Sequence, residues 1–474
     1  MKARLTASLL LALSLVGCDQ PGTHQTTFPS TLQAVEQATV EVPALPIVKW
    51  ETEHGVPVLF VPRTEVPMVD INIGFDAGSS RDGDKPGLAA FVSDLFNEGT
   101  DELSLEDIVN GFNAVGANFR SRSSSDMAAV SLRTLSDESY FEPALTLFLT
   151  VLSNPVYPQA AVQRHRQRLL QQFERERQTP QTQLSDRYRQ LVYGEHHPYA
   201  QRQYGTADTL PQLTPQTLTA FHRQHYTRAS AVISLVGDLN EAQARALAER
   251  ISHQLPAGNR LPALDKAKPR TRGVREFIEF PSEQTWFAIG NQAIWRNHED
   301  WPALYLANEI LGGSGFGSLL MEEVREKRGY VYGISSYFSR LLSAGPFTVQ
   351  FQTRADNASD ALQVTLEVIQ QFIAEGVSEQ RLKETVTATL NEFVLSNTDN
   401  ASLSNTLLAY GYYDLPLDYQ QQFVRQLQSL SAREVAETFA RHINPEHFAI
   451  VAAGRSSPFN EHTPANSEQP DNDR

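Results

Sequence analysis

The segment VISLVGD at residues 232–238 is echoed by FAIVAAG at residues 448–454. Each is a short apolar run that ends in a turn, which is typical of a buried β-strand. Gly237 and Gly454, which close the two strands, are 217 residues apart. This long-period repeat indicates that the chain contains two copies of one domain.

Two pairs of helical segments support the repeat. The amphipathic helix around residues 143–145 is matched by one around residues 360–362, again 217 residues later. A second helix ending at Phe173 is matched by one ending at Phe393, 220 residues later. Because three separate places agree, we expect two homologous halves.

Each half is expected to combine a sheet with helices. The first half opens with predicted strands at 56–61 and 69–75, and Pro57 either opens its strand or places it at a sheet edge. Helical stretches follow and then further strands, so the two kinds of element do not alternate strictly. This order predicts an α+β fold, in which each half packs a mixed or antiparallel sheet against helices.

The composition limits the domain organisation and the function classes. The chain has 474 residues, a formal net charge of −15, 41% hydrophobic residues and one cysteine. We place the two domains at 46–254 and 274–456, with a Pro- and Gly-rich linker at 255–273. We expect 18–45 to be a flexible tether and 457–474 a disordered tail. A single cysteine excludes intrachain disulfides, and the acidic charge argues against a nucleic-acid partner.

Residues 1–17 are predicted to be a secretory leader. Two basic residues precede an apolar run at 5–16 that is too short to span a bilayer, and the only cysteine, Cys18, follows directly. This order resembles a bacterial lipobox, so Cys18 is expected to carry lipid and to anchor the chain on the periplasmic side of the cell envelope. Asp19 resembles a signal for retention in the inner membrane, with the outer membrane as the alternative.

Residues 76–81, DAGSSR, and 87–100, GLAAFVSDLFNEGT, are similar to the opening of the pitrilysin (insulinase) zinc metallopeptidase family. That family carries an inverted zinc motif, His-x-x-Glu-His, on this helix. Residues four apart share a helix face and can hold one zinc ion, while the Glu activates the metal-bound water. A later helix supplies a third, acidic ligand. The resemblance covers most of residues 46–456 and implies the family's clamshell fold.

The zinc-site positions of this chain are all replaced. By the family motif, the first His position is Ala90, the Glu position is Ser93 and the second His position is Asp94. The helix expected to supply the third ligand has Gln172, or Gln171, at the acidic position. Alanine cannot ligate, and a serine hydroxyl does not act as a general base near neutral pH without help. We therefore expect no metal in this chain and no intact catalytic residue.

The second half keeps a different feature of the family. Residues 310–318, ILGGSGFGS, lead into residues 325–332, REKRGYVY. By the resemblance, Arg325 and Tyr332 reach the peptide next to the scissile bond. A guanidinium can donate to peptide carbonyls, and a phenol can donate to a developing oxyanion. Without the resemblance, the same stretch would read as an exposed helix end with ordinary surface charges.

Two other sequence patterns could be mistaken for a metal site or a nucleotide-binding loop. His196 and His197 are followed by Pro198 and lack acidic ligands at helical spacing, so we interpret them as structural or surface residues. The glycines of residues 312–317 follow no clear strand and precede no Gly-Lys-Ser/Thr, which argues against a nucleotide-binding loop.

The resemblance also implies a division of labour. Some bacterial and mitochondrial members, of the mitochondrial-processing-peptidase type, pair a zinc-bearing chain with a chain that has the Arg–Tyr pair and a degenerate zinc helix. We therefore predict a non-catalytic, substrate-binding subunit that forms a heterodimer with a zinc-bearing partner and receives unfolded peptides. One alternative is a stand-alone peptide-binding or chaperone-like lipoprotein that adds a peptide strand to an edge strand near 117–124. Another is an active peptidase with rearranged ligands.

Overall fold

The computed structural model describes residues 44–395 and 399–459, which belong to one compact unit. The predicted leader, Cys18, and most of the predicted tether and tail lie outside the described residues. Within the described ranges, the helices are all too short or too polar to cross a membrane.

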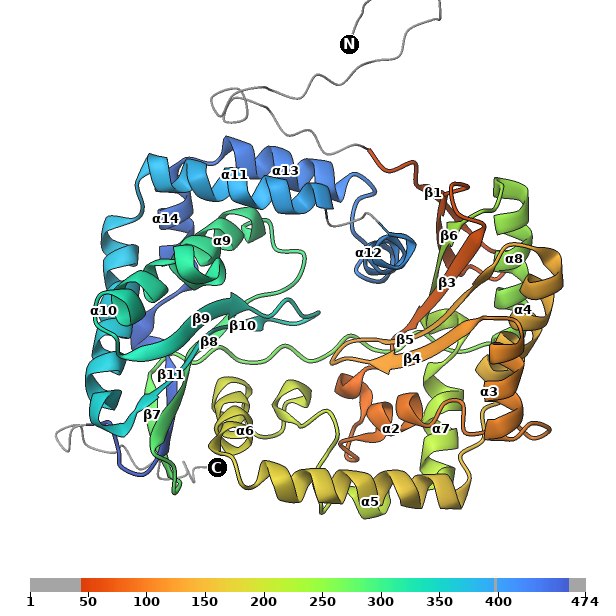
Figure 1. Cartoon of the computed structure of the whole chain (residues 1–474), viewed down its shortest axis with the longest axis horizontal. Coiled ribbons are helices and arrows are strands. Elements are labelled where there is room, and N and C mark those ends of the chain that lie inside the picture. Colours follow the sequence, from red (N-terminus) through yellow and green to blue (C-terminus); the bar gives the residue numbers. More distant parts are fainter. Residues whose placement is uncertain (1–43, 396–398, 460–474) are drawn as a thin grey trace, which may run out of the picture. The chain divides into compact units, whose positions relative to one another are not determined.

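The first half is built on a six-stranded mixed sheet with the strand order β1-β2-β6-β3-β5-β4 (Figure 1). Its strands are β1 Val48–Glu51, β2 Pro57–Pro62, β3 Met68–Phe75, β4 Asn118–Ser123, β5 Ala128–Leu135 and β6 Ala231–Gly237. β6 pairs parallel with β2 and antiparallel with β3, and all its residues are buried, which explains its unbroken apolar sequence. Pro57 is the first residue of β2, one of the two positions predicted for it.

The second half repeats this arrangement in a five-stranded sheet with the order β7-β11-β8-β10-β9. Its strands are β7 Val274–Glu279, β8 Gln284–Ile294, β9 Val331–Phe338, β10 Gly345–Arg354 and β11 Ala449–Gly454. β11 pairs parallel with β7 and antiparallel with β8, as β6 does with β2 and β3. The two segments that revealed the repeat therefore occupy equivalent places, and the predicted two-halved α+β fold is confirmed.

Helices cover one face of each sheet and enclose a separate hydrophobic core in each half. Those of the first core are α2 Leu88–Asp94, α3 Leu105–Ala114, α4 Glu138–Ser153, α5 Gln159–Glu176, α7 Pro215–His225 and α8 Glu241–Gln254. Those of the second core are α9 Trp301–Asn308, α10 Ala358–Glu375, α11 Glu379–Leu395, α13 Tyr419–Ser429 and α14 Ala432–His442. The matched helices α5 and α11 continue past the ends predicted at Phe173 and Phe393.

The opposite face of each sheet is covered by a helix from the other half. Helix α12, Asn400–Tyr412, places Leu403, Leu407 and Leu408 against Leu59 and Val232 of the first sheet (Figure 1). Helix α6, Pro180–Tyr193, packs in the same way on β8 and β11 of the second sheet. Because each half completes the other's sheet, apolar burial holds the two halves together.

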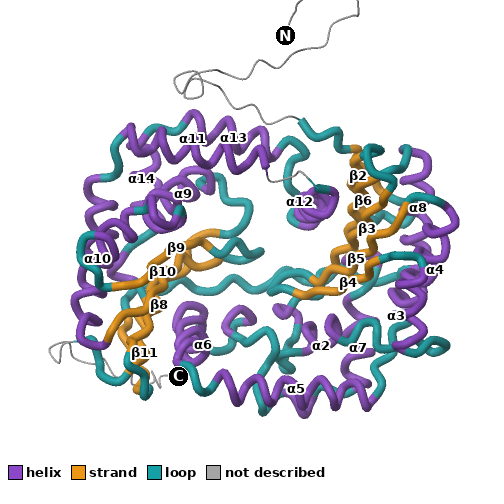
Figure 2. Tube along the Cα trace, viewed as in Figure 1, coloured by secondary structure: helices purple, strands orange, loops and turns teal. Residues whose placement is uncertain are grey.

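The segment 255–273 joins the halves without forming a helix or a strand (Figure 2). Its backbone is held by side chains of both halves: Arg81 donates to the carbonyl of Pro262 at 2.9 Å, and Gln292 donates to that of Lys268 at 3.1 Å. The linker is therefore held against both halves by hydrogen bonds.

Candidate functional site

The three predicted zinc-motif positions lie on α2, and a buried carboxylate fixes the start of this helix. Asp82 accepts hydrogen bonds from the backbone N–H groups of Gly87, at 2.8 Å, and Ala89, at 2.7 Å. These are donors that the first turn of a helix leaves unpaired. Burial raises the pKa of Asp82 to about 7, against the opposing effect of these hydrogen bonds.

The side chains at the three motif positions on α2 differ in their burial and in their contacts. Ala90 is completely buried, at 0% exposure, and its methyl group offers no ligand atom at the first ligand position. Ser93 is also buried, and its hydroxyl lies 3.0 Å from the hydroxyl of Ser121 on β4. Asp94 is the one partly exposed member of the three.

A guanidinium from α5 stands beside Asp94. Arg168 lies 3.7 Å from the Asp94 carboxylate and donates to Nδ1 of His165 at 2.6 Å. Nε2 of His165 lies 3.4 Å from the same carboxylate. Since Nδ1 accepts from Arg168, neutral His165 carries its proton on Nε2, facing Asp94. These three side chains lie together in one polar group, which we call the Asp94 triad.

Burial dominates the electrostatics of the Asp94 triad. It lowers the pKa of His165 to about 4, with the neighbouring Arg168 charge acting in the same direction, so the imidazole is neutral near pH 7. Burial also raises the pKa of Asp94, while Arg168 opposes that rise. The fixed positive charge here comes from an arginine of the chain itself.

These residues do not fit a zinc ion bound in the family's manner. Zinc takes nitrogen, sulfur or carboxylate ligands, whereas Ala90 offers no ligand and Ser93 is paired with another hydroxyl. The predicted third position, Gln172, donates to Glu176 at 2.7 Å and is a neutral amide. The one remaining carboxylate, Asp94, already faces a guanidinium.

The residues singled out in the second half lie together at the surface. Arg325 belongs to a short π-helical segment, Met321–Glu326, and Tyr332 is the second residue of β9. The Arg325 guanidinium lies 5.4 Å from the centre of the Tyr332 ring and 4.5 Å from that of Phe316. Tyr332 is 84% exposed and Phe316 68% exposed. Two open aromatic rings therefore flank one guanidinium.

Neighbouring acidic residues do not neutralise Arg325. Glu322 pairs with Lys327 at 2.9 Å and with Arg381 at 3.1 Å, while Glu323 pairs with Lys327 and Arg328. Within residues 44–395 and 399–459, Arg325 itself forms no ion pair. Its charge is thus available to a molecule that approaches this surface.

The fold of this chain matches solved structures of other proteins. A crystal structure described as the peptidase M16 inactive domain from Pseudomonas fluorescens matches with a TM-score of 0.83 and 36% identity, covering 87% of this chain and 98% of that one. The chain belongs to the peptidase M16 family. The family description "Insulinase (Peptidase family M16)" matches residues 58–201, and "Peptidase M16 inactive domain" matches residues 212–389. The predicted pitrilysin/insulinase resemblance is confirmed, and the chain is an inactive M16 homologue.

More distant M16 relatives include proteins named as proteases and one named as a non-peptidase. The "Non-peptidase homolog YmxG" of Helicobacter pylori is 24% identical over 405 residues, which span 84% of this chain and 92% of that protein. An "Uncharacterized zinc protease" of Mycobacterium tuberculosis is 24% identical over 403 residues, or 83% of this chain and 90% of that protein. The M16 fold is thus shared with proteins named as peptidases and with one named as a non-peptidase.

Two further groups of side chains in the described ranges have ligand atoms close enough to hold a metal ion. One consists of His298, Asp300 and His442, but the Asp300 carboxylate already accepts from His442 at 2.7 Å and Arg441 at 3.0 Å. The other consists of three residues near the β1–β2 turn and α8: Glu53, Glu249 and His253. His197, in contrast, stacks on Tyr193 and lies 3.2 Å from the Asp265 carbonyl, in keeping with a structural residue.

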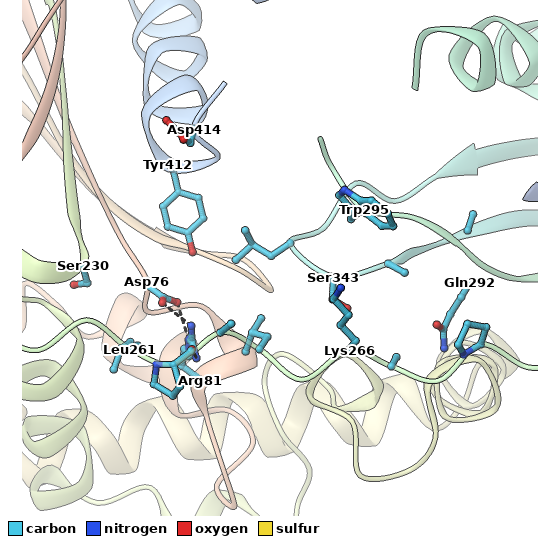
Figure 3. Close-up of a pocket in the computed structure, with 18 of the residues that line it drawn as sticks. Asp76, Arg81, Ser230, Leu261, Lys266, Gln292, Trp295, Ser343, Tyr412 and Asp414 are labelled. Carbon is cyan, nitrogen blue, oxygen red and sulfur yellow. Dashed lines mark hydrogen bonds and ion pairs between the residues drawn. The ribbon is translucent and has the colours of Figure 1, made fainter. Parts of the chain in front are cut away.

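A cavity of about 1450 Å³, which the sequence did not predict, lies where the linker passes the strand ends of both sheets (Figure 3). Leu261 and Lys266 of the linker, Tyr412 of α12 and Trp295 line it. Its lining comes from many separate segments, so no local pattern could reveal it. It includes none of the zinc-motif positions, nor Arg325 or Tyr332.

Proposed function

We propose that this M16 chain is the non-catalytic, substrate-binding subunit of a heteromeric zinc peptidase. The observation that carries the proposal is a contrast between the two halves. In the first half, Ala90 and the Asp94 triad replace the metal site. In the second half, Arg325 and Tyr332 remain adjacent and open to solvent.

The pair has the chemistry to assist a reaction in another chain. The Tyr332 side chain is 84% exposed, so its hydroxyl can donate to a tetrahedral oxyanion formed on a bound peptide. The Arg325 guanidinium can hold the neighbouring peptide carbonyls with several fixed donors. The zinc ion and the general base would come from the partner chain. The name "Non-peptidase homolog" of the Helicobacter pylori relative is in keeping with this role.

The proposal is tested by reconstitution. The chain should form a 1:1 complex with an M16 chain from the same genome that has an intact His-x-x-Glu-His motif. Metal analysis should find zinc in the partner but none in this chain alone, and peptide cleavage should require both chains. Tightly bound zinc in this chain with cleavage by it alone would instead establish an active peptidase with rearranged ligands.

We propose further that lipid on Cys18 anchors the complex at a bacterial membrane, facing the periplasm. Support comes from the sequence order of basic residues, apolar run and cysteine. A Cys18→Ser chain should lose incorporation of labelled fatty acid and appear in the soluble fraction. Membrane fractionation would then assign the inner membrane, as favoured by Asp19, or the outer membrane.

One observation favours a second candidate function, a stand-alone peptide-binding lipoprotein. β4 is an edge strand, as predicted for residues 117–124, and its outer side pairs with no strand of the described residues. An extended peptide can add to such an edge. A chain that binds peptides but ignores every zinc-bearing M16 chain offered to it would favour this function.

A further inference from the structure

The edge strand β4 carries two arginines whose charges are not neutralised. Arg120 and Arg122 are exposed and alternate with partly buried residues along the strand. Their partners are neutral amide oxygens: Arg120 donates to Asn118 Oδ1 at 2.8 Å, and Arg122 donates to Asn405 Oδ1 at 2.8 Å. In the ranges 44–395 and 399–459, neither arginine lies within ion-pair distance of a carboxylate.

The chain as a whole is acidic, with a net charge of −15, and the neighbouring strands differ from β4 in charge. On the adjacent strand β5, Arg133 is paired with Asp70 at 2.9 Å. The corresponding edge strand of the second sheet, β9, has the sequence VYGISSYF and no charged residue. A pair of unneutralised cations therefore distinguishes the β4 edge from its counterpart.

A third cation lies near the same edge. A surface hollow of about 310 Å³ is lined by Arg120 and Ser121 of β4, by Asp94 of α2 and by Arg168 of α5. The Arg168 side chain is 66% exposed and lies 3.7 Å from Asp94. Two guanidiniums against one carboxylate leave the hollow with net positive charge. It occupies the region where the M16 zinc helix meets the edge strand.

We propose that β4 selects extended peptides with acidic side chains at alternate positions. This inference rests on the proposed peptide-binding function and specifies its substrate class. In a peptide paired with β4, side chains two residues apart lie on one face and are separated by roughly 7 Å. A carboxylate at each of two such positions would meet Arg120 and Arg122, and the positive charge of Arg168 at the adjoining hollow would add to the attraction.

A different role for the arginines predicts a different result. Charged side chains on an edge strand can simply prevent strands of other molecules from pairing with it. In that case a charge of either sign would serve, and the strand would show no preference for acidic peptides. Replacing the two arginines by acidic residues therefore distinguishes the selection of acidic peptides from the protection of the edge strand against pairing.

The experiment uses the full chain and three fluorescent peptides of one β-prone sequence, with Glu, Gln or Lys at two alternate positions. At low salt the Glu peptide should bind at least about fivefold more tightly than the Gln peptide, and the Lys peptide more weakly than either. The preference should shrink as salt screens the charges. The double variant Arg120→Glu/Arg122→Glu should reverse the order of the Glu and Lys peptides. Arg272→Glu/Arg275→Glu, which changes the net charge equally elsewhere, should not.

The possible negative results exclude different parts of the proposal. Equal binding of the three peptides, or an order that the β4 double variant leaves unchanged, would overturn the acidic selection while leaving peptide binding intact. No binding of any of them, by the chain alone or in its complex with a zinc-bearing chain, would overturn both the selection and the proposed function.

Discussion

At the scale of single residues, an arginine lies beside the carboxylate at one of the predicted zinc-motif positions, Asp94. The sequence was sufficient to place Ala90, Ser93 and Asp94 at the motif positions on one helix. It could not show that Arg168 and His165 surround Asp94, because that contact depends on how α5 packs against α2. The motif therefore predicts which positions are replaced, whereas the charges around Asp94 become visible only in the tertiary structure.

The buried Ala90 makes the first lost ligand difficult to restore. Ala90→His would force a ring into a position with 0% exposure. We expect a loss of about 1–3 kcal/mol in the free energy of unfolding, measured by urea denaturation, because overpacking strains a close-packed region. Metal analysis of the same variant should find no zinc. Unchanged stability would show that the position can still accept a ligand.

The neutral His165 predicts a pH dependence. Its folded pKa of about 4 lies below the unfolded value of about 6.5, so the unfolded chain binds the additional proton between these values. Its contribution to stability is therefore lost as the pH falls through this window. Between about pH 7 and pH 5, the wild-type chain should lose about 2 kcal/mol more stability than His165→Gln. Equal losses in the two proteins, measured by urea unfolding at each pH, would contradict the assignment.

At the scale of elements, the exchange of α6 and α12 between the halves is the main feature that the sequence did not reveal. Apolar periodicity identifies the buried face of a helix, but it does not say which sheet that face meets. The 217-residue repeat correctly placed β6 and β11 in equivalent positions. It predicted two homologous halves but gave no sign that each sheet is covered by a helix of the other half.

Removing an apolar side chain from α12 should loosen the contact between the halves. Leu407 is completely buried against the first sheet. Leu407→Ala should therefore lower the free energy of unfolding by about 2–5 kcal/mol. Cleavage within the linker by a protease under native conditions should become faster. Leu427→Ala, which removes the same volume inside the second core, serves as the control. Equal rates of linker cleavage in the two variants would mean that α12 does not hold the halves together.

At the scale of the whole molecule, a buried carboxylate also joins the halves. Asp126 of the first half accepts from the backbone N–H of Leu342 at 2.9 Å and from the hydroxyls of Tyr199 and Tyr413. Burial raises the pKa of Asp126, and the hydrogen bonds oppose that rise. Three donors from both halves therefore converge on one side chain.

Asp126→Ala would leave those donors without their acceptor. We expect a loss of about 2–5 kcal/mol in the free energy of unfolding, since buried unpaired polar groups are costly. Asp84→Ala, at an exposed position, should leave the free energy of unfolding nearly unchanged. A small effect of Asp126→Ala in the same denaturation experiment would show that water replaces the carboxylate.

The activity of the reconstituted complex with Tyr332→Phe tests whether this inactive chain assists catalysis in a zinc-bearing partner. Loss of a single oxyanion donor should lower kcat about 100-fold and change KM little. Tyr140→Phe, which removes a hydroxyl from a partly exposed tyrosine on α4, should retain full activity. Full activity of the Tyr332→Phe complex would contradict a role of this chain in catalysis.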